Sequence, residues 1–183
     1  LGFNAGEAVQ AYTHPLWFIL WTTLGSFTGQ WAFGVLAMGV VFTTIAVALL
    51  ILRVSSVPIL IGVTALLLFS NAFMEYSTSG LENPLAYAFA GILITLTAVR
   101  SPSLAPTWWA ILLGVSASGF FLTRMDLVVV LTPVVATLVW ENRRSLRVIA
   151  LGLGAFALPT ALWFLWTYVN YSVWLPNTFA AKR

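Results

Sequence analysis

The feature that most constrains this chain is the length of its apolar runs. Residues 31–52 contain no charged side chain, and residues 148–169 are similarly free of charge. A helix that spans a bilayer needs about 20 mostly apolar residues. These runs, together with several shorter ones, predict an all-α, polytopic bundle of transmembrane helices.

The composition supports the same conclusion. Hydrophobic residues make up 61% of the chain and charged residues only 7%, which is too little charge for an ordinary soluble domain. The nine tryptophans fit the aromatic belts found at membrane surfaces. The chain has no cysteine, which excludes disulfides and thiolate metal sites. A net charge of +3 is better explained by membrane topology than by nucleic-acid binding, so no nucleic-acid partner is expected.

The polar stretches divide the chain into three parts of one transmembrane domain. Residues 1–30 are expected to form an external loop and a short helix. Residues 31–169 should form about six transmembrane helices, and residues 170–183 should begin an external segment. The chain does not begin with Met, so we expect it to be a fragment of a longer protein.

The first apolar helix, at 15–29, allows two orientations. It could cross the bilayer, although fifteen residues are few for a crossing. It could also lie flat on the external surface as an interfacial juxtamembrane helix, because Trp17, Leu20, Trp21 and Leu24 form an apolar stripe. We predict the flat orientation.

Charge assigns the loops to two faces of the membrane. Positively charged loops stay on the cytoplasmic side, and five arginines occupy alternate loops: Arg53, Arg100, Arg143, Arg144 and Arg147. The remaining loops then lie on the external face. That face carries charges of both signs: Glu75, Glu82, Arg124, Asp126, Lys182 and Arg183. Topology alone does not require mixed charge, so the external face is expected to contain a functional site.

Four short motifs on this face resemble those of a known family. They are Tyr12–Trp17 (YTHPLW), Gly80–Pro84 (GLENP), Thr123–Asp126 (TRMD) and Leu175–Phe179 (LPNTF). In this order they resemble GT-C type integral-membrane glycosyltransferases. The chain is most similar to the mycobacterial and corynebacterial terminal arabinofuranosyltransferases of the arabinofuranosyltransferase B group. The resemblance covers nearly the whole chain, but only part of such an enzyme.

This resemblance implies a function at the external, periplasmic face of the plasma (inner) membrane. Such enzymes transfer a sugar from a polyprenyl phosphate, here a donor similar to decaprenyl-phosphoryl-arabinofuranose. The acceptor would be the arabinan of arabinogalactan and lipoarabinomannan, and membrane lipid would surround the protein. The family's catalytic carboxylate is expected upstream of Leu1, and its C-terminal external domain is expected beyond Arg183. No cofactor is evident, although a divalent cation could be shared with the upstream carboxylate.

Transfer from a lipid phosphate requires cations that stabilise the leaving phosphate. Arg124 is the main candidate for donor phosphate binding; alternatively, it pairs with Asp126 or extends to lipid headgroups. Asp126 is expected to orient Arg124 rather than to act as a base. Lys182 and Arg183 could contact the phosphate or could be ordinary interfacial charges. His14, the single histidine, could donate to the phosphate or serve a structural role.

Transfer also requires groups that bind the sugar and the acceptor. Glu82 could bind a sugar hydroxyl or support the upstream acid; alternatively, it is a helix N-terminal residue favoured by the macrodipole. Glu75 and Tyr76 allow the same two interpretations, and the structural one is preferred there. Asn177 could bind sugar hydroxyls or form a turn after Pro176. No cluster has the spacing of metal ligands, so no metal site is predicted.

Two non-enzymatic functions remain as alternatives. A transporter or flippase for lipid-linked sugars should carry ionisable groups near the middle of its helices. The apolar segments here carry few polar groups beyond Ser, Thr and Asn71, which disfavours transport. A motility-associated membrane scaffold without catalysis is the other alternative.

Overall fold

The computed structural model describes residues 13–52, 54–98, 104–172 and 174, and the regular elements in these ranges are all helical. The α-helices are α1 (Pro15–Thr28), α2 (Trp31–Ile51), α3 (Val57–Leu68), α4 (Asn71–Thr78), α5 (Asn83–Ala98), α6 (Pro106–Thr123), α7 (Thr132–Glu141) and α8 (Leu146–Tyr171). A 3₁₀ helix, η1 (Met125–Leu131), joins α6 to α7. The all-α prediction is confirmed.

Local sequence signals mark several helix boundaries. Pro15, Pro58 and Pro106 lie in the first turns of α1, α3 and α6, where a missing backbone N–H removes no helical hydrogen bond. Gly29 ends α1 in the left-handed conformation, with φ of 69°, which glycine adopts without strain. The Ser70 hydroxyl accepts a hydrogen bond from the Phe73 N–H and so caps α4.

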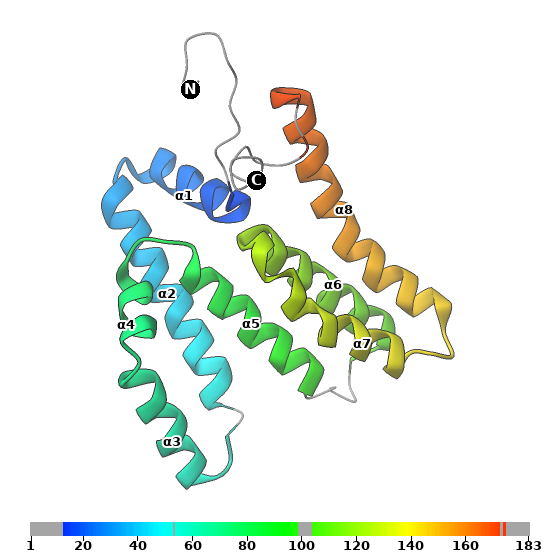
Figure 1. Ribbon diagram of the computed structural model, residues 1–183, viewed down its shortest axis with the longest axis horizontal. Coiled ribbons are helices and arrows are strands. Elements are labelled where there is room, and N and C mark those ends of the chain that lie inside the picture. The colour runs from blue at the N-terminus through cyan, green and yellow to red at the C-terminus, as the bar shows by residue number, and fades with distance from the viewer. Residues whose placement is uncertain (1–12, 53, 99–103, 173, 175–183) are drawn as a thin grey trace.

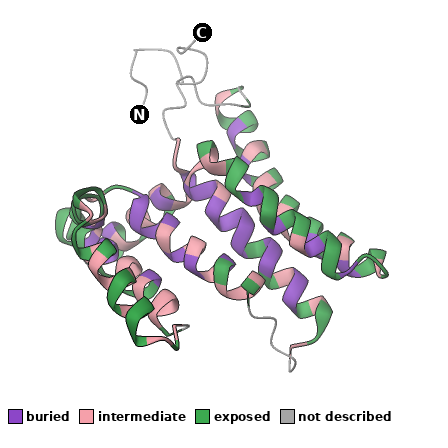
Figure 2. Cartoon of the chain, turned by 60° about the horizontal axis from the view of Figure 1, so that its bottom comes forward, coloured by how far each residue is buried: buried purple, intermediate pink, exposed green. Residues whose placement is uncertain are grey.

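Helix α6 lies at the centre of the bundle, between α5 and α8, while α2 packs against the other side of α5 (Figure 1). The main core follows α6, where Trp109, Leu113 and Phe120 are buried. A smaller core joins α1, α2 and α5 through Trp17, Met38 and Leu85, the last two beside Pro84 and its neighbours. Figure 2 shows buried residues following the inner helices and exposed residues along the outer ones.

Small residues set the distance between α6 and α8. A Cβ atom added at Gly114 would collide with the backbone carbonyl of Gly152. One added at Gly152 would come within 2.8 Å of the Leu138 side chain. Glycine at both positions therefore allows the helix backbones to approach closely, as in many membrane helix pairs.

Three described helices are long and apolar enough to cross a membrane: α2, α6 and α8. Helices α3 and α4 add a fourth if they count as one span broken by a 64° bend. By this criterion the described residues hold fewer spans than the expected six or so. Helix α5 is apolar but has only 16 residues, and the segment expected at 127–140 is divided between η1 and α7.

The connections between helices gather at two ends of the bundle (Figure 1). One end, here called the arginine end, carries Arg143, Arg144 and Arg147, while Arg53 and Arg100 lie outside the described residues. The opposite end, here called the cluster end, comprises residues 13–14, 79–84 and 123–126. Helix α1 lies across the cluster end (Figure 1), as an interfacial helix would, and its orientation relative to a bilayer stays a prediction.

Candidate functional site

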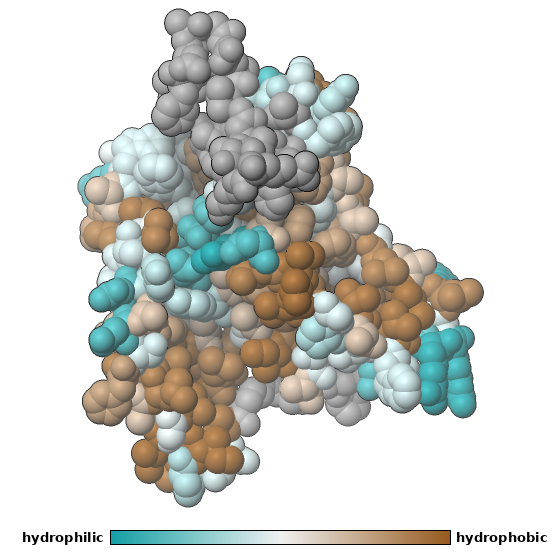
Figure 3. All heavy atoms as spheres, viewed as in Figure 1, coloured by the Kyte–Doolittle hydropathy of each residue, from teal (hydrophilic) through white to brown (hydrophobic). Residues whose placement is uncertain are grey.

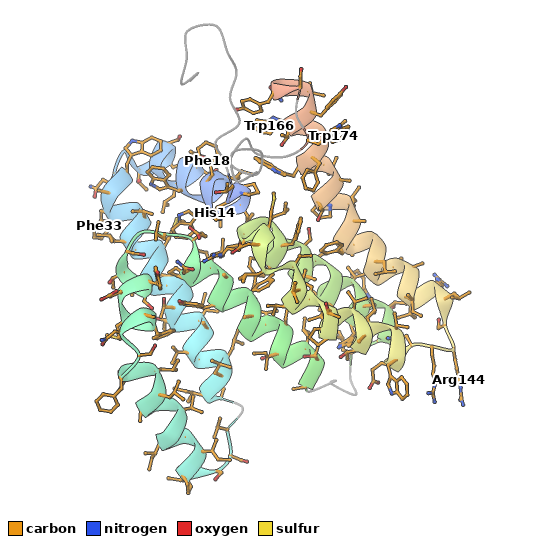
Figure 4. All side chains as sticks on the ribbon, in the orientation of Figure 1. His14, Phe18, Phe33, Arg144, Trp166 and Trp174 are labelled. Atoms are coloured by element: carbon orange, nitrogen blue, oxygen red, sulfur yellow. The ribbon has the colours of Figure 1, made fainter. Side chains whose placement is uncertain are left out.

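Side chains from three distant parts of the chain meet at the cluster end. His14 comes from the start of α1, Glu82 and Asn83 from the start of α5, and Arg124 and Asp126 from the connection that follows α6. Figure 3 shows hydrophilic residues gathered at this end, and others at the arginine end. Figure 4 labels His14 at the cluster end and Arg144 at the arginine end. These five residues are called the polar cluster below.

Arg124 occupies the position where α6 stops. Its backbone is extended, with φ of −147° and ψ of 99°, so the chain turns and Asp126 can fold back onto the guanidinium. Nη2 donates to Asp126 Oδ2 at 2.7 Å and Nε donates to Oδ1 at 3.2 Å, which makes a bidentate pair. Nη1 donates to Asn83 Oδ1 at 2.7 Å, and this contact joins α6 to α5.

The pairing of Arg124 with Asp126 changes the titration of both groups. Hydrogen bonds from Arg124 lower the pKa of the Asp126 carboxyl below its usual value, because they stabilise the ionised form. The same hydrogen bonds raise the pKa of the Arg124 guanidinium. Both groups therefore remain charged at neutral pH. Arg124 uses most of its donors within the protein, as the alternative interpretation of this residue expected.

Glu82 is the buried carboxylate of the cluster, with its side chain 8% exposed. Its Oε1 lies 3.5 Å from His14 Nε2 and 3.7 Å from Arg124 Nη1. Its backbone carbonyl accepts from the N–H groups of Leu85 and Ala86 and so begins α5. Glu82 is therefore both a helix N-terminal residue, as one interpretation predicted, and the carboxylate shared by two cations from other helices.

The contacts of His14 restrict where protons can lie. Its Nδ1 is 3.1 Å from the Thr123 carbonyl oxygen, which can only accept, so Nδ1 carries the hydrogen in this contact. Nε2 then faces the Glu82 carboxyl group. That approach is favourable when a proton lies on Nε2 or on the carboxyl. The pair can therefore hold one exchangeable proton at the cluster end.

A tight turn brings Glu82 to this position. Gly80 has a φ of 77°, a left-handed conformation that favours glycine, and its carbonyl accepts a hydrogen bond of 3.3 Å from Trp17 Nε1. Ser79 supports the turn, because its hydroxyl accepts from the Leu81 N–H. The turn is thereby attached to α1, next to His14.

Two cavities flank α1 beside the polar cluster. One, of about 550 Å³, lies between α1 and the Ser79–Gly80 turn and is lined by His14, Trp17 and Trp21 among others. The other, of about 500 Å³, lies between α1 and α8 and is lined entirely by apolar and aromatic residues. Phe18 lines both cavities. A third cavity, of about 620 Å³ and also mainly apolar, lies between α6, α7 and α8.

The other predicted site residues lie apart from this cluster. Glu75 and Tyr76 are exposed on α4, and no contact joins them to the five cluster residues within the described part of the chain. Asn177, Lys182 and Arg183 lie outside the described residues. Asn83 and the Thr123 carbonyl were missed as site groups, although both stand inside the motifs that contain Glu82 and Arg124. Across the described residues, no group of three or more His, Asp or Glu side chains could hold a metal ion.

Comparison with protein families, curated proteins and solved structures finds no match to this chain. What the residues and the structure support is a helical protein with three or four candidate membrane spans and a polar cluster at one end.

Proposed function

We propose that this chain forms part of a GT-C type membrane glycosyltransferase. In this proposal the protein transfers arabinofuranose from a polyprenyl-phosphate donor to cell-wall arabinan, at the external face of the plasma membrane. The polar cluster lies at that face, and the arginine end lies in the cytoplasm. The choice of arabinofuranose rests on the motif resemblance alone.

One observation carries the proposal: three of the four motifs meet in space. Contacts run from His14, in YTHPLW, to Glu82, in GLENP, and from Arg124, in TRMD, to both Glu82 and Asn83. The motifs are separated by 41 to 109 residues along the chain. Residues that carry a family resemblance and also converge at one membrane end support a common role.

The cluster offers suitable chemistry for this reaction. Glu82 could accept a hydrogen bond from a sugar hydroxyl or support the catalytic carboxylate expected upstream. Arg124 could assist a phosphate with the donors that Asp126 and Asn83 leave free, and His14 could add a proton or a positive charge. The apolar cavities beside α1 and between α6 and α8 could accommodate lipid.

A transporter or flippase is supported less well. Helices α2, α5 and α6 contain no Asp, Glu, Lys or Arg, and α8 carries only Arg147 near its start. Transport sites generally place such groups near the middle of the membrane. The charged groups of the described residues lie at the two ends instead.

The test is transfer of radiolabelled arabinose from decaprenyl-phosphoryl-arabinose to an arabinan oligosaccharide by the full-length gene product. Glu82→Gln should lower the transfer rate at least about tenfold, since it removes the carboxylate charge at the cluster. Glu75→Gln, at an exposed position on the same end, is the matched control and should keep the wild-type rate. Absence of transfer by the wild-type protein would reject the proposal. Unchanged donor affinity and turnover in Arg124→Ala would remove Arg124 from the site.

A further inference from the structure

The apolar cavity between α1 and α8 has one polar feature in its wall. Leu16 from α1, Leu122 from α6 and Pro159, Leu162 and Trp163 from α8 are among the residues that line its volume of about 500 Å³. Trp163 is 8% exposed, and its Nε1 is a buried donor with no hydrogen-bond partner in the described part of the chain. Leaving such a donor unsatisfied costs roughly 1–3 kcal/mol. A ligand oxygen in the cavity would remove that cost.

The N-terminus of α1 borders the same cavity. His14, which precedes the helix, makes no side-chain capping hydrogen bond, and Pro15 has no N–H. The first N–H of α1 with a helical partner belongs to Phe18, which donates to the His14 carbonyl. The N–H groups of Leu16 and Trp17 have no acceptor among the described residues. Free N–H groups and the helix dipole together favour an anion at this position.

The two features match the two parts of one kind of ligand. An apolar chain fits the cavity, an ester oxygen at the end of that chain could accept from Trp163 Nε1, and an anionic group could lie at the start of α1. The cavity is one apolar compartment, which suits a single chain better than the paired chains of a phospholipid. Arg124 is a weaker candidate for the anion, because Asp126, Asn83 and Glu82 already surround its guanidinium.

We infer that the cavity between α1 and α8 binds the phosphate-proximal end of a polyprenyl phosphate. The chain lies against Leu122, Pro159 and Leu162, the phosphoester oxygen accepts from Trp163 Nε1, and the phosphate lies at the N-terminus of α1. The inference rests on the proposed function for the identity of the lipid. It also explains why α1 lies between this cavity and the one beside His14: the lipid and the sugar would occupy opposite sides of one helix.

The test is binding of decaprenyl phosphate to the full-length protein, measured by native mass spectrometry and by titration in nanodiscs. Trp163→Phe keeps the ring but removes the donor, and should weaken binding about threefold to tenfold, the range for one hydrogen bond. In the absence of lipid the same variant should unfold at the same temperature as the wild type or higher, because the unsatisfied donor is gone. A merely structural tryptophan would instead give lower thermal stability and unchanged binding.

Thr43→Val is the matched control for this substitution. Thr43 Oγ1, on α2, is the other buried side-chain atom without a partner among the described residues, and Thr43 does not line the cavity. Thr43→Val should therefore keep wild-type affinity for decaprenyl phosphate while its thermal stability is unchanged or higher. Leu162→Trp fills the cavity from α8 and should weaken binding more than tenfold.

The outcomes separate this inference from the proposed function. Wild-type binding in both Trp163→Phe and Leu162→Trp would overturn the inference, and so would an equal loss of binding to phosphatidylglycerol. Transfer with an unchanged donor KM in both variants would overturn it while leaving the glycosyltransferase proposal intact. Binding that depends on Trp163, in a protein that transfers no sugar, would support the lipid site and reject the proposed function.

Discussion

The two ends of the bundle use charge in different ways. At the arginine end the charges of Arg143, Arg144 and Arg147 are exposed, and the described contacts are local: the Arg143 guanidinium lies 5.1 Å above the Trp140 ring, and Asn142 donates to the Leu138 carbonyl. At the cluster end, charges of both signs meet from helices far apart in the chain. Charge of one sign that stays dispersed suits the surface of a membrane, whereas opposite charges drawn together from three elements suit a site.

The difference has a structural cause. The cluster end depends on α6, because Thr123 and Arg124 end that helix and contact His14, Glu82 and Asn83. The arginine end depends only on the short connection between α7 and α8. A change that moves α6 should therefore disturb the cluster end more than the arginine end.

The largest effect is expected from Gly114→Ala. The added methyl group collides with the Gly152 backbone, which cannot move as a flexible side chain would, so α6 and α8 must separate. The cost should reach the upper end of the roughly 1–3 kcal/mol typical of overpacking. Thermal unfolding in detergent measures the loss. Gly154→Ala on α8 is the matched control: its methyl group meets nothing within 4 Å, so stability should be unchanged or slightly higher. Equal stability of the two variants would contradict the close approach of α6 and α8.

A smaller loss is expected from Glu82→Gln. Arg124 and His14 would keep their positions but lose the buried charge that faces both, at a cost of about 1–3 kcal/mol. Glu75→Gln, on the exposed face of α4, should change the free energy of unfolding by no more than about 0.5 kcal/mol. Similar unfolding temperatures for the two variants would show that the buried pair contributes no more than an exposed charge. The distinction between the two ends would then lose its energetic basis.

The sequence predicted the helical class, because apolar runs as long as 31–52 leave few other folds. It also predicted the pairing of Arg124 with Asp126 as one alternative, since residues two positions apart can meet wherever a helix stops. The contacts from Arg124 to Asn83 and from His14 to Glu82 could not be derived, because they depend on how α1, α5 and α6 pack. The number of spans was overestimated for a related reason: apolarity does not reveal the bend at Ser70 or the 3₁₀ segment after Arg124. The unsatisfied Nε1 of Trp163 has no sequence signal at all.

The acid stability of the cluster end should reflect Asp126. Its pKa is lowered in the folded protein, so its pairing with Arg124 stabilises the fold above the unfolded value of about 3.8. That contribution is lost as pH falls from about 4 through the lower folded pKa. The effect should be small, because the Asp126 side chain is 56% exposed and solvent screens the pair. Asp126→Asn should remove this part of the pH dependence, as measured by unfolding temperature between pH 3 and pH 6. A wild-type-like pH profile in the variant would exclude the pair as its source.

The smallest effect is expected at the arginine end. Arg143→Gln combined with Arg144→Gln removes exposed charges and one exposed cation–π contact, so stability should change by no more than about 1 kcal/mol. The role assigned to these arginines is orientation, and labelling can test it because the sequence contains no cysteine. In intact cells, a membrane-impermeant maleimide should label Ser79→Cys at the cluster end and should leave Arg144→Cys unlabelled until the membrane is permeabilised. Labelling of Arg144→Cys from outside would reverse the assigned faces, and the polar cluster would then lie in the cytoplasm, away from any acceptor in the cell wall.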